Sequence, residues 1–338
     1  MKPTENAPKK LVVVLGMHRS GTSAVARGLA ALGADLGGDL MPPGADNPRG
    51  YWEDLEVVQF NEELFSFLGT KLAELKSIGP SEVAALRERG FTERAAALLQ
   101  RKVDRHTTFA FKDPRTAKLW LFWREVLPRV QAEAGCVFVV RHPTSVAESL
   151  RKRNHIDPVH GQLLWLTHII AVAARPPACK TLVVDYDRLV ENPRGELTRI
   201  SQLLCLTADE QEISRYESDF LTKDLRHDVQ RGRPSSGVHP LVTEIYEALK
   251  GSATEGIFTG LPESASWAEE FDRLAPLLRQ MECLVGERNR LRKLLDGANF
   301  ELGWRDSSFS WRLTRPLRWL AGRLKPDSSI SLPGGIAK

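Results

Sequence analysis

The 338-residue sequence contains no apolar run of the ~20 residues that a membrane-spanning helix needs. The run LVVVL at residues 11–15 is also too short for the core of a signal peptide. A glycine-containing loop follows it where a signal peptide would have its cleavage site. We therefore expect a protein that stays in a reducing cytoplasm.

Cysteine is scarce, and its spacing excludes the common zinc and redox motifs. The four residues, Cys136, Cys179, Cys205 and Cys283, form no CxxC pair, and the histidines show no HExxH spacing. Three of these cysteines lie in apolar runs, so we expect buried, reduced thiols. Because a zinc site needs clustered ligands, we predict no metal site.

Neither sign of charge dominates the sequence. It has 47 Lys and Arg against 43 Asp and Glu, and the net charge of +4 is too small to indicate nucleic-acid binding. Internal repeats and low-complexity tracts are also missing. With 42% apolar and 27% charged residues, the composition is that of a soluble globular protein with one enzyme-sized domain and an appendage.

Short apolar runs predict buried strands, and helical patterns separate them. The strands are expected at residues 11–15, 108–111, 137–140 and 181–184. The helices are expected at residues 22–32, through most of 55–105, and at 116–130 and 145–153. Strands that alternate with helices predict an α/β fold, with three layers around a central parallel sheet.

The pattern changes after residue 232. Residues 231–238 (RGRPSSGV) have the composition of a linker, and no strand pattern follows. We therefore expect one domain at 9–232 and a helical extension at 240–338. In the extension, apolar residues recur at gaps of three and four, with Arg288 interrupting, which predicts a coiled-coil-like stripe that joins two copies of the chain. Its members are Leu274, Leu277, Met281, Leu284, Leu291 and Leu295.

The segment GMHRSGTS at residues 16–23 follows the first predicted strand and opens the first helix. Glycines let backbone N–H groups turn toward an anion, and the helix directs its positive dipole end to the same place. Thr22 and Ser23 add hydroxyl donors, and Arg19 adds a permanently charged fork. The alternative is a plain glycine turn. We predict a phosphate-binding loop made of Gly16, His18, Arg19, Ser20, Gly21, Thr22 and Ser23.

This loop differs from a Walker A loop at one position. GxxxxGK[ST] would place lysine where Thr22 stands, and that lysine normally reaches the β- and γ-phosphates of a triphosphate. Its absence argues against an ATPase or kinase, while Arg19 suits a single 5′-phosphate that carries a leaving group. A small-molecule kinase stays the alternative, with Asp185 as the Mg²⁺-binding aspartate.

GMHRSGTS resembles the 5′-phosphosulfate-binding loop of sulfotransferases that use 3′-phosphoadenosine 5′-phosphosulfate (PAPS), in which Arg or Lys stands at the position of Arg19. In the same family, an Arg at a strand end and a Ser eight residues later hold the 3′-phosphate, as Arg141 and Ser149 would. The alternative is a surface arginine and a solvated serine. The resemblance covers residues 9–230 and implies a P-loop-type fold of the bacterial or carbohydrate type.

The helix predicted at residues 145–153 is expected to begin with a capping box formed by Ser145 and Glu148.

The resemblance also implies catalytic residues. Lys112, in the segment KDPR, would neutralise the bridging oxygen as the sulfate leaves, together with Arg19. The alternative for Lys112 is a salt bridge to a surface carboxylate. Glu53 is the first choice as proton acceptor, with Asp113 and His155 in reserve.

The segment around Glu53 contains further candidates. Asp54 is expected to cap the helix that begins at Leu55. Tyr51 and Trp52 fit a sugar-binding wall and an ordinary core equally well. The family's late basic loop would correspond to residues 225–227, and its RKGxxG element is missing.

The carboxyl-terminal segment 309–325 is basic and amphipathic, with leucines on one helical face and no acidic residue. It predicts contact with a membrane surface, and the alternative is a helix docked on the domain or on a second subunit. The run SWRLTRPLRWL resembles tails of bacterial polysaccharide-assembly glycosyltransferases. This resemblance implies a glycan or glycolipid acceptor at the inner membrane.

Together these patterns predict a cytoplasmic sulfotransferase, peripheral on the inner membrane face, that transfers a sulfuryl group from PAPS to a hydroxyl without a metal or nucleic acid. A second alternative, besides the kinase, is a non-catalytic glycan- or partner-binding module.

Overall fold

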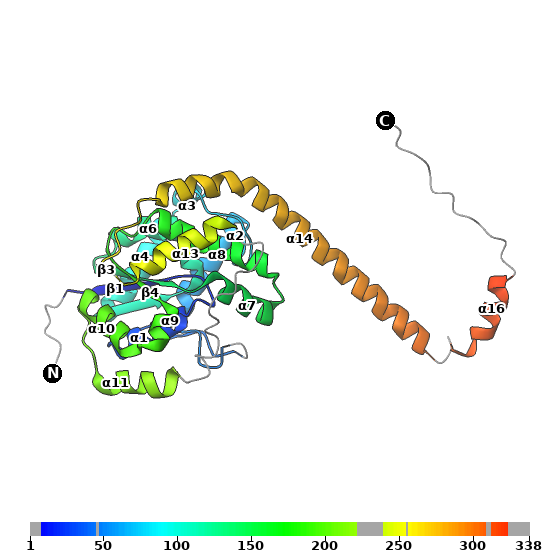
Figure 1. The fold of residues 1–338 in the computed structure, drawn as a ribbon, viewed down its shortest axis with the longest axis horizontal. Coiled ribbons are helices and arrows are strands. Elements are labelled where there is room, and N and C mark those ends of the chain that lie inside the picture. Colours follow the sequence, from blue (N-terminus) through cyan, green and yellow to red (C-terminus); the bar gives the residue numbers. More distant parts are fainter. Residues whose placement is uncertain (1–7, 45–46, 222–238, 255, 309–311, 324–338) are drawn as a thin grey trace. The chain divides into compact units, whose positions relative to one another are not determined.

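The computed structural model describes residues 8–44, 47–221, 239–254, 256–308 and 312–323 (Figure 1). The chain divides into two compact units, Met1–Arg279 and Gln280–Lys338. The first unit contains the sheet and all the predicted site residues, so the fold that positions the site is the fold of this unit.

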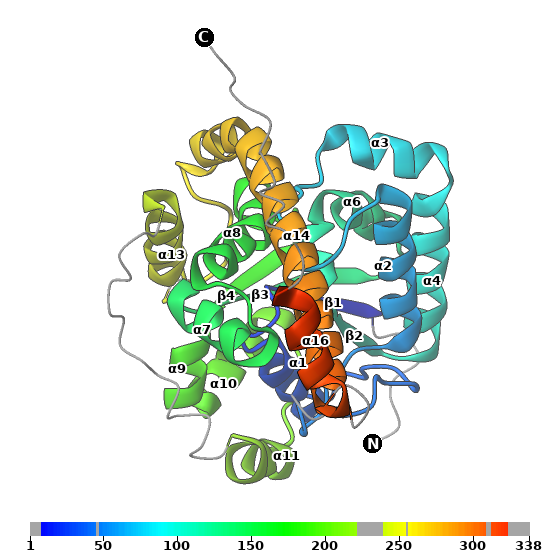
Figure 2. The ribbon, with the colours of Figure 1, turned by 90° about the vertical axis from the view of Figure 1, so that its right-hand side faces the viewer.

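Four strands form one parallel sheet in the order β2-β1-β3-β4 (Figure 2). Every strand that the apolar runs predict is present, and the parallel arrangement is confirmed. The bounds are β1 Lys10–Leu15, β2 Thr108–Lys112, β3 Glu133–Val140 and β4 Lys180–Asp185.

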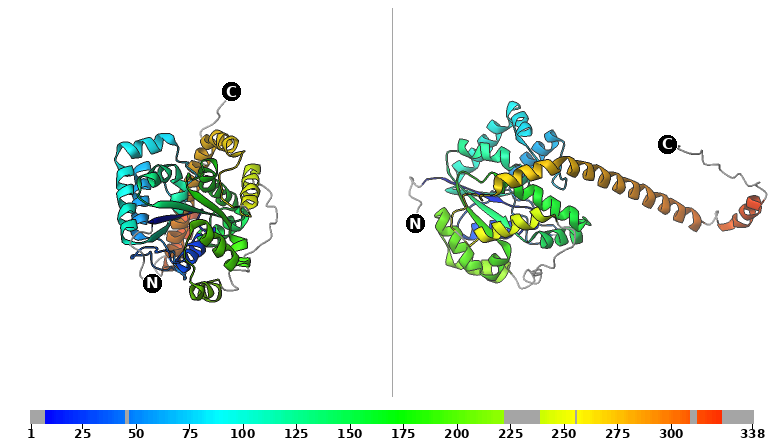
Figure 3. Two further views of the ribbon diagram at one scale, coloured as in Figure 1. Left: turned by 90° about the vertical axis from the view of Figure 1, so that its left-hand side faces the viewer. Right: turned by 45° about the horizontal axis from the view of Figure 1, so that its top comes forward.

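The strands are apolar without interruption because helices cover both faces of the sheet. Along β1, Leu11, Val13 and Leu15 point into one core, while Val12 and Val14 point into the other. The first core is covered by α2 Leu55–Leu68, α3 Pro80–Glu88, α4 Phe91–Arg105, α6 Trp120–Val126, α8 Pro158–Ala174 and α13 Pro240–Ser252. The second is covered by α1 Thr22–Ala31, α9 Tyr186–Glu191, α10 Pro193–Leu204 and α11 Glu210–Arg215, with η2 Tyr216–Phe220 beside them. Figures 1 and 3 show these three layers, which confirm the predicted α/β class.

Two predicted helices are interrupted in the structure. The helical stretch 55–105 contains an irregular segment between Gly69, which ends α2 in the left-handed conformation, and Pro80, which begins α3. The stretch 116–130 consists of α5 Pro114–Lys118, α6 and the 3₁₀ turn Leu127–Arg129, with a break at Leu119.

The helix α7 Pro143–Asn154 begins earlier than predicted. Its N-cap is His142, whose Nδ1 accepts the N–H of Thr144 at 3.3 Å. Glu148 pairs with Arg151 on the helix surface. The predicted capping box of Ser145 and Glu148 is therefore wrong, because proline at the first helical position already opens the helix one turn upstream.

The extension predicted from residue 240 begins with helices that belong to the sheet domain. Apolar residues of α13 and of the first turns of α14 Ser264–Ser307 join the first core. Farther along the chain lies α16 Arg315–Arg323, with Pro316 in its first turn as expected. Within the described ranges, no helix combines the length and the apolar character that crossing a membrane requires.

Candidate functional site

The predicted site residues meet at the carboxyl edge of the sheet. Gly16 follows β1, Lys112 ends β2, Arg141 follows β3 and Tyr186 follows β4. The chain leaves β1 for β2 on one side and later returns to β3 on the other. Such a reversal of strand order opens a crevice at the carboxyl ends, which is where open α/β sheets bind ligands.

The glycine loop requires its glycines. At Gly16, φ is +146° and a Cβ would lie 2.7 Å from the carbonyl oxygen of Val139. At Gly21, φ is +91° and a Cβ would lie 2.0 Å from the Tyr186 ring. Arg19 also has a left-handed backbone, with φ of 69°. A strained residue that carries a guanidinium at a helix amino terminus is typical of a binding loop.

The two predicted anion-binding elements touch each other. Arg19 Nε donates a hydrogen bond to Ser149 Oγ at 2.8 Å, and Arg141 Nη1 donates to the carbonyl oxygen of Arg19 at 3.2 Å. The guanidinium carbon of Arg141 lies 4.5 Å from the centre of the Tyr186 ring, and Trp165 Nε1 donates to the Arg141 carbonyl oxygen at 3.1 Å. The loop after β1 and the Arg141–Ser149 element thus form one surface.

Two cavities open on this surface. The Arg141 cavity has a volume of about 320 Å³, and the Lys112 cavity has a volume of about 230 Å³. They share the wall made by Arg19, Thr22, Ser23 and Asn47. The Arg141 cavity is further lined by Gly21, Ala24, Pro48, Arg49, Arg141, Tyr186 and Phe220. The Lys112 cavity is further lined by His18, Met41, Tyr51, Glu53, Leu72, Lys112, Pro114, Arg115 and Arg153.

The charges along the two cavities are almost all positive. Six cationic side chains line them, and Glu53 is the one carboxylate among the described lining residues. This arrangement suits a ligand with several negative charges. The six are Arg19, Arg49, Lys112, Arg115, Arg141 and Arg153.

Lys112 and Glu53 form a buried ion pair. Their side chains are 3% and 6% exposed, and Nζ lies 2.5 Å from Oε1. Lys112 Nζ also donates to the carbonyl oxygen of Tyr51 at 2.8 Å, and Arg115 Nη1 lies 3.8 Å from Glu53 Oε2. Burial raises the pKa of the Glu53 carboxyl above its usual value, while the Lys112 ammonium opposes that rise. Lys112 thus forms a salt bridge, as the alternative expected, but its partner is a buried carboxylate and not a surface one.

Hydrogen bonds fix the position of Glu53 in an otherwise irregular segment between α1 and α2. The Met41 N–H donates to the Glu53 carbonyl oxygen at 2.8 Å. Asp54 caps α2, as predicted, by accepting the N–H of Val57, and it pairs with Lys102 at 2.7 Å. Ser23 Oγ donates to the Tyr51 carbonyl oxygen at 3.2 Å, so this predicted phosphate donor also holds the segment against α1.

Two buried polar atoms of the loop have no hydrogen-bond partner among the described residues: His18 Nδ1 and Ser20 Oγ. Buried polar atoms of this kind usually serve a ligand or an ordered water. His18 lies edge-on to His168, with ring centres 5.6 Å apart. Burial, together with the positive charges of nearby Arg153 and Arg19, lowers the pKa of His18 to about 3. The imidazole of His18 is therefore neutral.

The reserve candidates lie apart from this arrangement. Asp113 caps α5 and also accepts from Arg115 and Asn61, so its carboxylate is occupied by structural contacts. His155 is exposed at the end of α7 and lines neither cavity. Asp185, the predicted magnesium ligand of a kinase, caps α9 and accepts from Arg188 N at 3.0 Å.

The sequence did not single out Tyr186, Arg49, Arg115 or Arg153 as site residues. Tyr186 and Arg115 follow predicted strands, Arg49 lies in the segment before α2, and Arg153 lies near the end of α7, but their contacts depend on the fold. The predicted basic loop at 225–227 and the linker at 231–238 lie outside the described residues.

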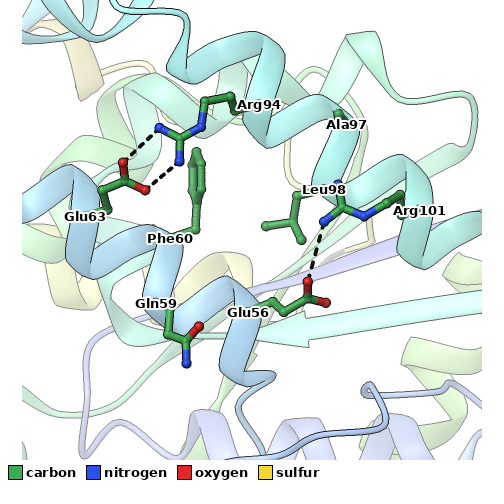
Figure 4. A pocket seen from close by; sticks show the side chains of 8 residues that line it. All are labelled: Glu56, Gln59, Phe60, Glu63, Arg94, Ala97, Leu98 and Arg101. Carbon is green, nitrogen blue, oxygen red and sulfur yellow. Dashed lines mark hydrogen bonds and ion pairs between the residues drawn. The ribbon is translucent and has the colours of Figure 1, made fainter.

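A third groove, of about 380 Å³, lies between α2 and α4 (Figure 4). Its arginines are already paired, Arg94 with Glu63 at 2.7 Å and Arg101 with Glu56 at 3.5 Å. No residue from the carboxyl edge of the sheet lines this groove. It is therefore not part of the site.

The sulfotransferase family model matches residues 12–210, more than half of the chain, and the chain belongs to that family. The resemblance seen in the sequence is confirmed at this level. No curated protein sequence matched the chain.

Three solved sulfotransferase structures are similar in part. The sulfotransferase domain of the Synechococcus PCC 7002 olefin synthase is 19% identical, with 80% of this chain and 98% of that chain covered and a TM-score of 0.39. The sulfotransferase domain from the curacin biosynthetic pathway is 15% identical, with 78% of this chain and 98% of that chain covered and a TM-score of 0.37. Sulfotransferase STF1 from Mycobacterium tuberculosis H37Rv is 14% identical, with 72% of this chain and 77% of that chain covered and a TM-score of 0.36.

Replacing Gly21 tests the geometry of the loop. Gly21→Ala places a methyl group inside the Tyr186 ring and forces alanine into the left-handed region. We expect the free energy of unfolding, measured with denaturant, to fall by more than ~1 kcal/mol. Gly38→Ala is the matched control, because a Cβ there meets no atom within 4 Å. Equal stability of the two variants would contradict the described packing of the loop.

Proposed function

We propose that the protein transfers a sulfuryl group from PAPS to the hydroxyl of a glycan or glycolipid. The observation that carries this proposal is the pair of cavities that share the wall of Arg19, Thr22, Ser23 and Asn47. A group-transfer enzyme needs a donor and an acceptor to meet at one point, and the shared wall provides it. The family membership supplies the reaction class.

The residues of the Arg141 cavity fit the donor. Beside this cavity, Gly16 and Gly21 let the loop pack closely on Val139 and Tyr186, where a Cβ would clash, and Ser20 Oγ is a buried hydroxyl without a hydrogen-bond partner among the described residues. The loop would hold the 5′-phosphosulfate, while Arg141 and Ser149 would hold the 3′-phosphate. Tyr186 stacks on the Arg141 guanidinium and orients it.

In the proposed reaction, Glu53 takes the proton of the acceptor hydroxyl while the acceptor oxygen forms its bond to sulfur. The bond from sulfur to the bridging oxygen breaks, and Lys112 and Arg19 stabilise the negative charge that collects on that oxygen. Because Lys112 is bound to Glu53 before reaction, its ammonium must turn from the carboxylate to the bridging oxygen. That exchange leaves Glu53 freer to accept the proton.

The acceptor would enter the Lys112 cavity. Tyr51 lines this cavity and could stack on a sugar. Trp52 instead packs beside Arg27 and Phe220 against the second core, which favours a structural role for it. The sugar-binding wall proposed for the two aromatic residues is therefore limited to Tyr51.

Calorimetric titration with 3′,5′-adenosine bisphosphate tests the donor site. We expect binding that Arg141→Ala weakens by ~2–5 kcal/mol, the scale of losing one partner of a desolvated charge contact. Arg94→Ala is the control, because Arg94 lies in the groove between α2 and α4. Binding of ATP–Mg²⁺ instead would support the kinase, and binding of neither nucleotide would favour the non-catalytic module.

Glu53→Gln tests the proton acceptor. We expect turnover to fall ~10²–10⁴-fold with nearly unchanged bisphosphate affinity, since the amide cannot accept the proton. Activity of the unchanged enzyme requires the carboxylate. Because its pKa is raised, activity should fall on acidification at a pH above the usual titration range of Glu.

Glu63→Gln, a surface partner of Arg94, is the control for this variant. Full turnover by the Glu53→Gln variant would exclude Glu53 as the proton acceptor.

The tail supports a peripheral location on the inner membrane face. In α16, Leu317, Trp319 and Leu320 are exposed, with Arg315 before them and Arg318 among them. Each basic residue near anionic lipid could add ~1 kcal/mol of binding. We expect the full chain to sediment with anionic vesicles, less so at high salt, and deletion of 307–338 to abolish this. Failure of the full chain to bind would contradict the proposed location.

A further inference from the structure

One face of α14 is apolar and exposed over much of its length. Six large apolar side chains along it are each 39–60% exposed. Single exposed leucines are common on protein surfaces, but a regular row of them is not. The six are Leu277, Met281, Leu284, Leu291, Leu295 and Leu302.

The row follows a heptad repeat. Steps of four and three residues connect Leu277 to Leu302, with Arg288 and Ala298 at the two intervening positions. Met281, Arg288, Leu295 and Leu302 then occupy position a, and Leu277, Leu284, Leu291 and Ala298 occupy position d. The repeat spans 26 residues, or ~39 Å of helix, which reaches the three to four heptads typical of a coiled coil.

Residues that disfavour a helix interface lie away from this row. Gly286 is at position f, Gly297 at c and Gly303 at b. Pro276, inside the helix, is at c. The row is therefore free of the residues that would break knobs-into-holes packing.

We propose that this face of α14 pairs with the same face of a second copy of the chain, in a parallel two-stranded coiled coil. Positions 277–302 define the seam. The proposal concerns assembly and does not depend on the transfer reaction proposed above.

The charges beside the seam favour this partner. Glu287 is at position g and Arg292 is at the following e. In a parallel, in-register pair, position g of one helix faces the next e of the other, so Glu287 would meet the partner's Arg292 on both sides of the seam. A self-complementary pattern of this kind points to a second copy.

Arg288 favours two strands over more. A charged residue at position a costs less in a two-stranded coil, where its long side chain can reach water at the edge of the seam. Leucine at three of the four d positions is also typical of parallel dimers.

Sedimentation equilibrium of the full chain tests the proposal. We expect the mass of a dimer, and a dissociation constant raised ~100-fold or more by Leu284→Ser with Leu291→Ser. Phe300→Ser is the control, because Phe300 is 76% exposed at position f, off the seam. A monomeric or higher-order wild type would overturn the proposal, and so would a dimer that survives the double change.

Arg288→Leu provides a variant that does not rely on loss of structure. It replaces the charge in the seam by an apolar side chain, so the dissociation constant of the dimer should fall at least ~10-fold. An unchanged dissociation constant would show that Arg288 does not lie in the dimer interface, and would contradict the proposed seam.

Cysteine cross-linking tests the parallel register. In a background of Cys205→Ser and Cys283→Ser, Leu291→Cys should give a disulfide-linked dimer with dioxygen and a copper catalyst, since two d residues face each other. Gly297→Cys, at position c, should not. Absence of the Leu291→Cys dimer would exclude the parallel arrangement.

Discussion

The buried ion pair between Lys112 and Glu53 joins the two halves of the site. Lys112 ends a strand, whereas Glu53 belongs to an irregular segment outside the four-stranded sheet. Taking two charges out of water costs several kcal/mol per ion, so neither side chain is stable there without the other. The pair therefore fixes the segment before α2 against the carboxyl edge of the sheet, and Tyr51 and Asn47 are carried into the cavities with it.

The rest of the site follows from the parallel sheet. Because all four strands point the same way, each of them delivers its following residue to one edge. That geometry gathers Arg19, Lys112 and Arg141 from distant parts of the chain. Repulsion among such cations is unfavourable without counter-charge, and Glu53 is the one carboxylate that lines their cavities among the described residues. The cations at the carboxyl edge of the sheet therefore destabilise the protein without a ligand, and a bound anion would relieve their repulsion.

Local patterns predicted the sheet well and the helix boundaries less well. The four strands are short, apolar and bounded by polar residues, so each could be identified alone. The break at Leu119 could not, because it depends on how α5 and α6 pack on α8 and the sheet. Ser145 and Glu148 have the spacing of a capping box, yet Pro143 opens the helix first. In that case the stronger local signal, proline at the first helical position, is present in the sequence.

The predicted phosphate-binding loop could be identified from local sequence alone, since the glycines, the hydroxyls and Arg19 are adjacent in the chain. The sequence by itself also determined the heptad spacing in α14. Local sequence does not reveal that Arg141 touches Arg19, that Tyr186 lies against both Gly21 and Arg141, or that Glu53 rather than Asp113 lines the cavity. Those contacts join residues far apart in sequence, and their geometry arises only when the helices and strands pack around the two cores.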